Sequence, residues 1–136
     1  MDIRKINDAL SVSPQIRPCD VEKIKQAGFV AIVNNRPDGE EAGQPLARDI
    51  AAAAREHGIP VHHVPVTRPP FDADSLQRVR DILREADGPV LFFCRTGTRC
   101  TNLWALAHAG ELPGEDMIDM AFDAGYDISA LRDQLK

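Results

Sequence analysis

The sequence contains no apolar run near the roughly 18 residues that a membrane-spanning helix requires. Its three cysteines, among 136 residues, are too few and too unevenly spaced for the disulfide framework of a small secreted protein. Sixteen basic residues stand against 21 acidic ones, and the net charge of −5 argues against general binding to nucleic acid or to an anionic membrane. The first residues also lack the apolar core of a signal peptide. These deficits predict a cytoplasmic protein.

Motifs for metals and nucleotides are missing as well. The adjacent His62 and His63 fall on an expected strand, where successive side chains point to opposite faces, so they cannot chelate one ion together. No other spacing of histidine, cysteine or carboxylate residues is typical of a metal site, and no glycine-rich phosphate-binding motif occurs. We therefore expect neither a metal nor an organic cofactor.

What the sequence does contain is a regular alternation of short apolar runs with longer amphipathic ones. Its 43% of hydrophobic and 27% of charged residues suit one folded domain. The expected strands are 10–16, 29–33, 60–66 and 89–93, and the expected helices are 20–27, 45–57, 72–87 and 100–109, with further helical segments to the C-terminus. Such alternation predicts a single α/β domain over residues 1–136, with a mostly parallel sheet flanked by helices.

Three loops follow expected strands on the side where parallel sheets bind ligands. They start at Asn34, Thr67 and Cys94. The third is the most informative, because Cys94 stands between a buried strand and the start of a helix, where backbone N–H groups and the helix dipole favour an anion. A thiol in that position is expected to ionise easily.

The residues after this cysteine have the composition of a nucleophilic site. Arg95 and Arg99 bring two positive charges close to the sulfur, and Gly97 lets the backbone turn without a Cβ clash. The thiolate is the nucleophilic form of cysteine, so the loop suits covalent catalysis on an anionic substrate. A merely structural cysteine would leave both arginines and the glycine unexplained.

The loop also carries a resemblance. Residues 94–99, Cys-Arg-Thr-Gly-Thr-Arg, resemble the rhodanese pattern Cys-Arg-x-Gly-x-Arg, in which the cysteine carries a persulfide sulfur. Residues 10–16 and 34–40, the latter Asn-Asn-Arg-Pro-Asp-Gly-Glu, resemble the opening of dual-specificity protein tyrosine phosphatases. Together these segments resemble the DUF442 family, the β-lactamase-hydrolase-like phosphatase-like domain. The resemblance implies a tyrosine-phosphatase-like fold and, as a partner, a metalloenzyme that oxidises persulfides.

Loop length favours sulfur transfer over phosphate hydrolysis. Tyrosine phosphatases use His-Cys-x5-Arg, whereas this chain has Phe93-Cys94-x4-Arg99, which is one residue shorter and lacks the histidine. We therefore predict a rhodanese-type sulfurtransferase that moves sulfane sulfur from thiosulfate or a small persulfide to a thiol acceptor such as glutathione, through a Cys94 persulfide. The alternatives are a cysteine-dependent phosphatase with a Cys94 phosphocysteine and a noncatalytic redox-sensing thiol domain.

Further residues are assigned roles around the nucleophile. Asp72 and Asp74 follow the third strand, where phosphatases of this fold place a general acid, although helix capping explains them better. Cys100 is a candidate redox partner that would resolve an oxidised or persulfidated Cys94, or else a small apolar core residue. Thr101 offers a hydroxyl in place of the residue that often follows the loop arginine. Arg99 is expected to be catalytic with Cys94, and the expected substrate-binding residues are Arg95, Thr96, Gly97, Thr98 and Arg36. For Arg36, a structural ion pair with a carboxylate of its own loop, which contains Asp38 and Glu40, is an equal alternative.

Overall fold

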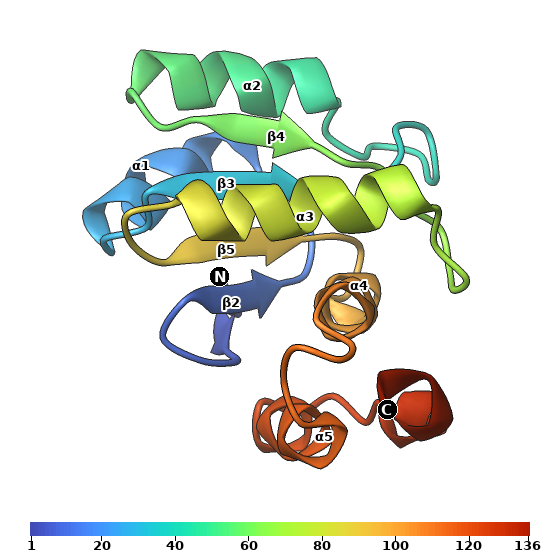
Figure 1. Ribbon diagram of the computed structural model, residues 1–136. Helices are drawn as coiled ribbons and strands as arrows, with labels where there is room; N and C mark the ends of the chain where they lie inside the picture. Colours follow the sequence, from blue (N-terminus) through green and yellow to red (C-terminus); the bar gives the residue numbers. More distant parts are fainter.

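A five-stranded sheet runs through the centre of the computed structural model, which describes all 136 residues (Figure 1). The strands β2, β5, β3 and β4 are parallel, and only β1 runs antiparallel, on β2. The predicted mostly parallel sheet is thereby confirmed. In sheet order the strands are β1 (Arg4–Lys5), β2 (Leu10–Ser13), β5 (Val90–Phe93), β3 (Ala31–Asn34) and β4 (Val61–His63).

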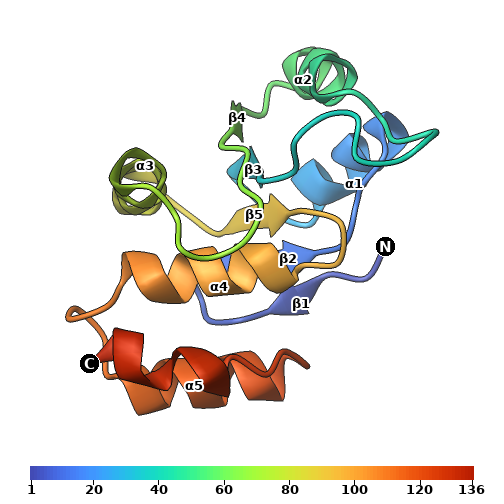
Figure 2. The same cartoon turned by 90° about the vertical axis from the view of Figure 1, so that its right-hand side faces the viewer.

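Helices cover both faces of the sheet, as the alternating pattern predicts (Figures 1 and 2). The 3₁₀ helix η1 (Pro18–Asp20), α1 (Val21–Gln26) and α2 (Ala47–Glu56) lie on one face. On the other face lie α3 (Ala73–Glu85) and α4 (Thr98–Ala107), and α5 (Gly114–Asp123) and the 3₁₀ helix η2 (Ser129–Leu135) pack outside α4. None of these helices is long and apolar enough to cross a bilayer.

The central strand β5 contributes side chains to the hydrophobic cores on both faces of the sheet. Phe92 belongs to the core beneath α3, α4 and α5, whereas Leu91 and Phe93 belong to the core beneath α1 and α2. All four residues of β5 are fully buried, which explains its continuous apolar sequence. Cys94 continues the alternation from Phe92 and so faces the α3 and α4 layer.

The parallel strands end at one level, and this places the loops after them side by side. Ser13, Phe93, Asn34 and His63 are register partners across the four strands. Cys94 N–H donates to the Ser13 carbonyl at 3.4 Å, and Asn35 N–H donates to the Phe93 carbonyl at 2.9 Å. The segments after β2, β3, β4 and β5 therefore meet at one edge of the sheet, as expected for a ligand site in this class of fold.

Some boundaries of helices and strands differ from the expected ones. The strand expected over 60–66 is regular only over Val61–His63. Beyond it the Val64 and Val66 N–H groups donate to the consecutive carbonyls of Asn34 and Asn35, each at 2.9 Å, which breaks the alternate spacing of a parallel ladder. The helix expected from Asp20 starts with the 3₁₀ turn η1 before α1 begins at Val21. The antiparallel β1 was not expected, since two exposed residues carry no periodic signal.

Candidate active site

Cys94 is the first residue after β5, and its accessible surface is zero. The loop that follows curls back onto the sulfur, so that the Gly97 N–H donates to Cys94 Sγ at 3.1 Å. Gly97 has φ = +95°, a left-handed conformation that side chains disfavour, and it is the N-cap of α4. The sulfur therefore sits at the start of a ten-residue helix, enclosed by its own loop.

Hydrogen bonds to the sulfur lower the pKa of Cys94 to about 5. The largest cause is the neighbouring Cys100 thiol, and the backbone N–H groups of Cys100, Thr96 and Gly97 add to it; burial acts in the opposite direction and is outweighed. These donors stabilise the charged form, so Cys94 is a thiolate at neutral pH.

Cys100 lies in the first turn of α4 and is fully buried. Burial and the facing Cys94 raise the pKa of its thiol well above the ordinary value, so it stays protonated as a donor. All three cysteines are free thiols in the structure. The role of Cys100 as a redox partner stays a prediction. The hydroxyl of Thr101 is not free for the sulfur, since it donates to the Gly97 carbonyl at 2.8 Å.

Arg99, on the first turn of α4, is held in place by acceptors from two other loops. Its Nη1 and Nη2 donate to the two carboxylate oxygens of Glu40, both at 2.8 Å, and Nη1 also donates to the Val66 carbonyl at 3.0 Å. The Nε–H and one Nη2–H have no partner in the protein. These two groups form one edge of the guanidinium, which is the geometry that binds an oxyanion in bidentate fashion.

Glu40 connects Arg99 to a second arginine, Arg36. Arg36 Nε donates to Glu40 Oε1 at 2.9 Å, Nη2 donates to Glu41 at 2.7 Å, and Nη1 donates to Gln15 at 3.0 Å. The bidentate bond from Arg99 is the main cause that lowers the pKa of Glu40 to about 2, with Arg36 contributing further. The sequence assigned Arg36 to substrate binding. In the structure its side chain is only 2% exposed, and its guanidinium bonds to side chains of the protein.

The remaining residues of the loop lie at its rim. Arg95 is 65% exposed, with its Nε 3.8 Å from Glu41. Thr96 and Thr98 are exposed, and the Thr96 hydroxyl donates to the Thr98 hydroxyl at 3.1 Å. The structure thus brings the predicted residues 94–99 together in one short turn, with the exposed side chains toward solvent and the amides toward sulfur.

One residue of the site was missed by the sequence reasoning. Tyr126, in the turn after α5, donates its hydroxyl hydrogen to the Thr96 carbonyl at 3.0 Å. No motif surrounds this single tyrosine, and it lies 30 positions from its partner in the chain. Only the packing of α5 and η2 on α4 brings it to the cysteine loop.

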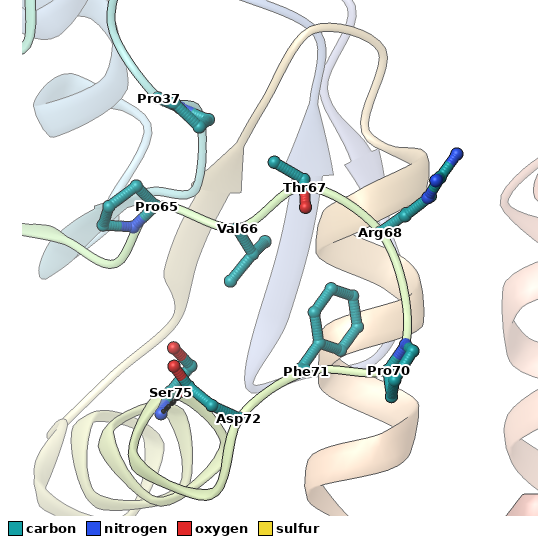
Figure 3. Close-up of a pocket in the computed structure, with 9 residues that line it drawn as sticks. All are labelled: Pro37, Pro65, Val66, Thr67, Arg68, Pro70, Phe71, Asp72 and Ser75. Atoms are coloured by element: carbon teal, nitrogen blue, oxygen red, sulfur yellow. Dashed lines mark hydrogen bonds between the residues drawn. The ribbon is translucent and has the colours of Figure 1, made fainter.

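A pocket of about 290 Å³ lies next to Arg99. Val66, whose carbonyl accepts a hydrogen bond from Arg99, is one of the residues that line this pocket (Figure 3). Asp72 lies at its lower rim and accepts a hydrogen bond from the Ser75 N–H at 2.7 Å, as the N-cap of α3. This bond lowers the pKa of Asp72, which keeps its carboxyl ionised. Asp74 is exposed in the first turn of α3. The capping role weighed for Asp72 is therefore the one that the structure displays.

Comparison with known proteins agrees with this arrangement. Residues 2–111 match the family model of the beta-lactamase hydrolase-like protein, phosphatase-like domain. A beta-lactamase hydrolase-like protein of Agrobacterium fabrum is 33% identical over 128 residues, which are 93% of this chain but 30% of that protein. The chain therefore spans less than a third of the length of this relative.

Solved structures show the same fold. A candidate phosphatase of Neisseria meningitidis is 36% identical, with a TM-score of 0.86 over 100% of this chain and 97% of that one. The structure described as Tk-PTP in the active form, at 16% identity, has a TM-score of 0.68 over 98% of this chain and 92% of that chain. The tyrosine-phosphatase-like fold implied by the resemblance is confirmed.

The names of these relatives support a phosphatase-like protein, and none of them names sulfur transfer. They thus agree better with the phosphatase alternative than with the predicted sulfurtransferase. The family model alone matches most of the chain, and it includes both the loop after β3 and the cysteine loop. The chain belongs to the family of the phosphatase-like domain of beta-lactamase hydrolase-like proteins.

Proposed function

We propose that the protein transfers sulfane sulfur, with Cys94 as the atom that carries it. The observation on which this rests is the short loop: only four residues separate Cys94 from Arg99, and its amides converge on the sulfur itself. Donors of this loop, among them the Gly97 N–H at 3.1 Å from Sγ, stabilise a thiolate and suit a small anionic adduct such as a persulfide. The low pKa of Cys94, about 5, supplies the nucleophile at neutral pH.

In the first step the Cys94 thiolate attacks the outer sulfur of a donor such as thiosulfate. A new S–S bond forms at Sγ, the S–S bond of the donor breaks, and sulfite leaves with the electron pair. The free Nε and Nη2 edge of Arg99 suits the oxyanion end of such a donor. A thiol acceptor such as glutathione then attacks the outer sulfur of the persulfide and returns Cys94 to the thiolate.

The state of Asp72 supports a reaction that needs no proton donor. Sulfite is a weakly basic leaving group, whereas the alcohol or phenol of a phosphate ester requires a general acid. Asp72 caps α3 and has a lowered pKa, so it is ionised at neutral pH and is poorly suited to donate a proton.

Phosphate ester hydrolysis is the second candidate. It is favoured by the candidate phosphatase of N. meningitidis, which is 36% identical over the whole of this chain. The same Cys94 would attack phosphorus, and the same Arg99 edge would bind the phosphoryl oxygens. The two functions thus share a nucleophile and differ in the group that it carries.

Intact-mass measurement separates the two candidates. After incubation with thiosulfate we expect the wild type to carry one added sulfur, lost again on addition of glutathione, and we expect Cys94→Ser to carry none. Cys19→Ser, which changes an exposed cysteine far along the chain, should load like the wild type. Absence of any sulfur adduct with thiosulfate and small persulfides, together with Cys94-dependent turnover of an aryl phosphate, would establish the phosphatase in its place.

The partners follow from the same chemistry. We propose a small sulfur anion as the donor, a low-molecular-weight thiol such as glutathione as the acceptor, and the reducing cytoplasm as the compartment in which they meet. The product, a small persulfide, is the substrate of a persulfide-oxidising metalloenzyme, which we propose as the partner that consumes it.

A further inference from the structure

Tyr126 contacts the cysteine loop through a single peptide group. Its hydroxyl donates to the Thr96 carbonyl oxygen at 3.0 Å. That carbonyl shares its peptide group with the Gly97 N–H, which donates to Cys94 Sγ at 3.1 Å. A planar peptide therefore links the tyrosine hydroxyl to the nucleophilic sulfur.

We propose that Tyr126 is a positioning residue for Cys94, which fixes the Thr96–Gly97 peptide so that its N–H points at the sulfur. Carbonyl and N–H lie on opposite sides of a trans peptide, so holding the oxygen on Tyr126 holds the hydrogen on Sγ. In the flipped orientation the carbonyl oxygen would face the thiolate and repel it. The bond to the oxygen also polarises the peptide and strengthens its N–H as a donor.

Gly97 is the reason that this peptide needs a restraint from outside the loop. Glycine populates positive and negative φ about equally, so the peptides on either side of it rotate easily. The following peptide is held from within α4, because the Thr101 N–H and hydroxyl donate to the Gly97 carbonyl at 3.1 and 2.8 Å. The preceding peptide is held by Tyr126. A Cβ at position 97 would collide with the Tyr126 hydroxyl, which shows how closely the ring covers the loop.

Tyr126 is itself held by residues from distant parts of the chain. Its N–H donates to the Ala121 carbonyl at 2.8 Å, and the Arg4 guanidinium lies 6.0 Å from the centre of its ring. Arg4 also donates to the Ala124 carbonyl at 3.1 Å. The restraint on Tyr126 thus comes from β1 and from the segment after α5. The proposal rests on the proposed function only in taking Cys94 as the nucleophile, whichever group Cys94 carries.

Titration of the Cys94 thiolate in Tyr126→Phe tests the proposal without any substrate. The ultraviolet absorbance of the thiolate is followed against pH, and the same curve for the matching Cys94→Ser variant is subtracted. We expect the apparent pKa of Cys94 to rise by about half a unit to one unit, the equivalent of roughly one hydrogen bond. The other titratable groups that face Cys94, namely Cys100 and Arg99, are unchanged in this variant.

A control and a second measurement make the outcome decisive. Phe122→Leu changes an exposed residue of the same segment, 68% accessible, and should leave the pKa of Cys94 where it is. In Tyr126→Phe, turnover should fall about three- to tenfold at a pH below the thiolate pKa and match the wild type at a pH well above it. An unshifted Cys94 pKa would overturn the proposal, and so would a turnover loss equal at all pH values, which would mark Tyr126 as packing only.

Discussion

Glu40 fixes the orientation of the Arg99 guanidinium in the site. It accepts two hydrogen bonds from Arg99 and one from the buried Arg36, so the exposed arginine edge is held through the carboxylate of a different loop. Charge-assisted bonds of this kind contribute about 1.5–3 kcal/mol each when they are made in a protected site. The position of Arg99 therefore depends on a residue that does not touch the sulfur.

Glu40→Gln keeps the shape of this side chain and removes its charge. We expect the KM for thiosulfate to rise roughly tenfold, because Arg99 is no longer held by a bidentate ion pair. The variant should also be less stable, with a loss that depends on pH. Glu40 has a pKa of about 2 in the folded protein against 4.5 ordinarily, so its contribution is complete above about pH 4.5 and is lost as the pH falls toward 2.

Urea unfolding at a series of pH values measures this dependence. The difference in free energy of unfolding between wild type and Glu40→Gln should shrink from pH 5 to pH 2, by at most about 1.4 kcal/mol per pH unit. Glu115→Gln, which breaks an exposed ion pair with Arg132, serves as the control and should change stability little. A difference that stays constant over this pH range would contradict the assignment of Glu40.

At the scale of elements, substitutions at the start of α3 test whether its two carboxylates, Asp72 and Asp74, are structural or catalytic. We expect Asp72→Asn and Asp74→Asn to leave sulfur transfer nearly unchanged, since asparagine also caps helices and sulfite leaves without a proton. Asp72→Ala should lower the melting temperature, because the Ser75 N–H loses its acceptor. Steady-state rates and thermal melts of the three variants provide the measurement.

A phosphatase would respond differently. Loss of a positioned general acid typically costs about 10² to 10⁴ in rate, and the loss is greatest for a poor leaving group. If Asp72→Asn or Asp74→Asn lost most activity on a poorly activated aryl phosphate, the general-acid role would stand and the sulfur-transfer assignment would fail.

The order and kind of the elements could be predicted from the sequence because each carries its own local signal. The buried strand β5 is a continuous apolar run, and α3 has an apolar stripe and a capping aspartate. Local signals place the cysteine loop correctly as well, since strand, glycine and helix start are consecutive in the chain.

Contacts between loops could not be predicted in the same way. Glu40 lies 59 positions from Arg99 and Tyr126 lies 30 from Thr96, and neither pair leaves a pattern in the sequence. Likewise, β1 is two residues long and exposed, so only its pairing with β2 defines it. These features arise from tertiary packing, which a single sequence does not display.

At the scale of the whole molecule, the segment after α4 completes the core on one face of the sheet. Met117, Ile118, Ile128, Leu131 and Leu135 are all buried there. Each fully buried side chain of this size contributes roughly 1.5–3 kcal/mol, and their sum is comparable to the total stability of an ordinary domain, about 5–15 kcal/mol. The part of the chain that matches the family model therefore lacks a complete core.

A chain that ends at Glu111, where the family match stops, should not fold. Far-ultraviolet circular dichroism and thermal melting should show no cooperative transition for residues 1–111, whereas deletion of Lys136 alone, an exposed residue, should leave the melt unchanged. A truncated chain that melts like the wild type would show that α5 and η2 are dispensable for stability.

The charged groups of the site add up to a net charge near zero. Arg36, Arg95 and Arg99 face Glu40, Glu41 and the Cys94 thiolate, three positive groups against three negative ones. A persulfide would replace one monoanion by another and keep the site neutral, whereas a phosphocysteine would bring nearly two negative charges. An enzyme with this neutral site could store a sulfur atom without changing its charge, so that its loaded and empty forms would attract an approaching thiol equally.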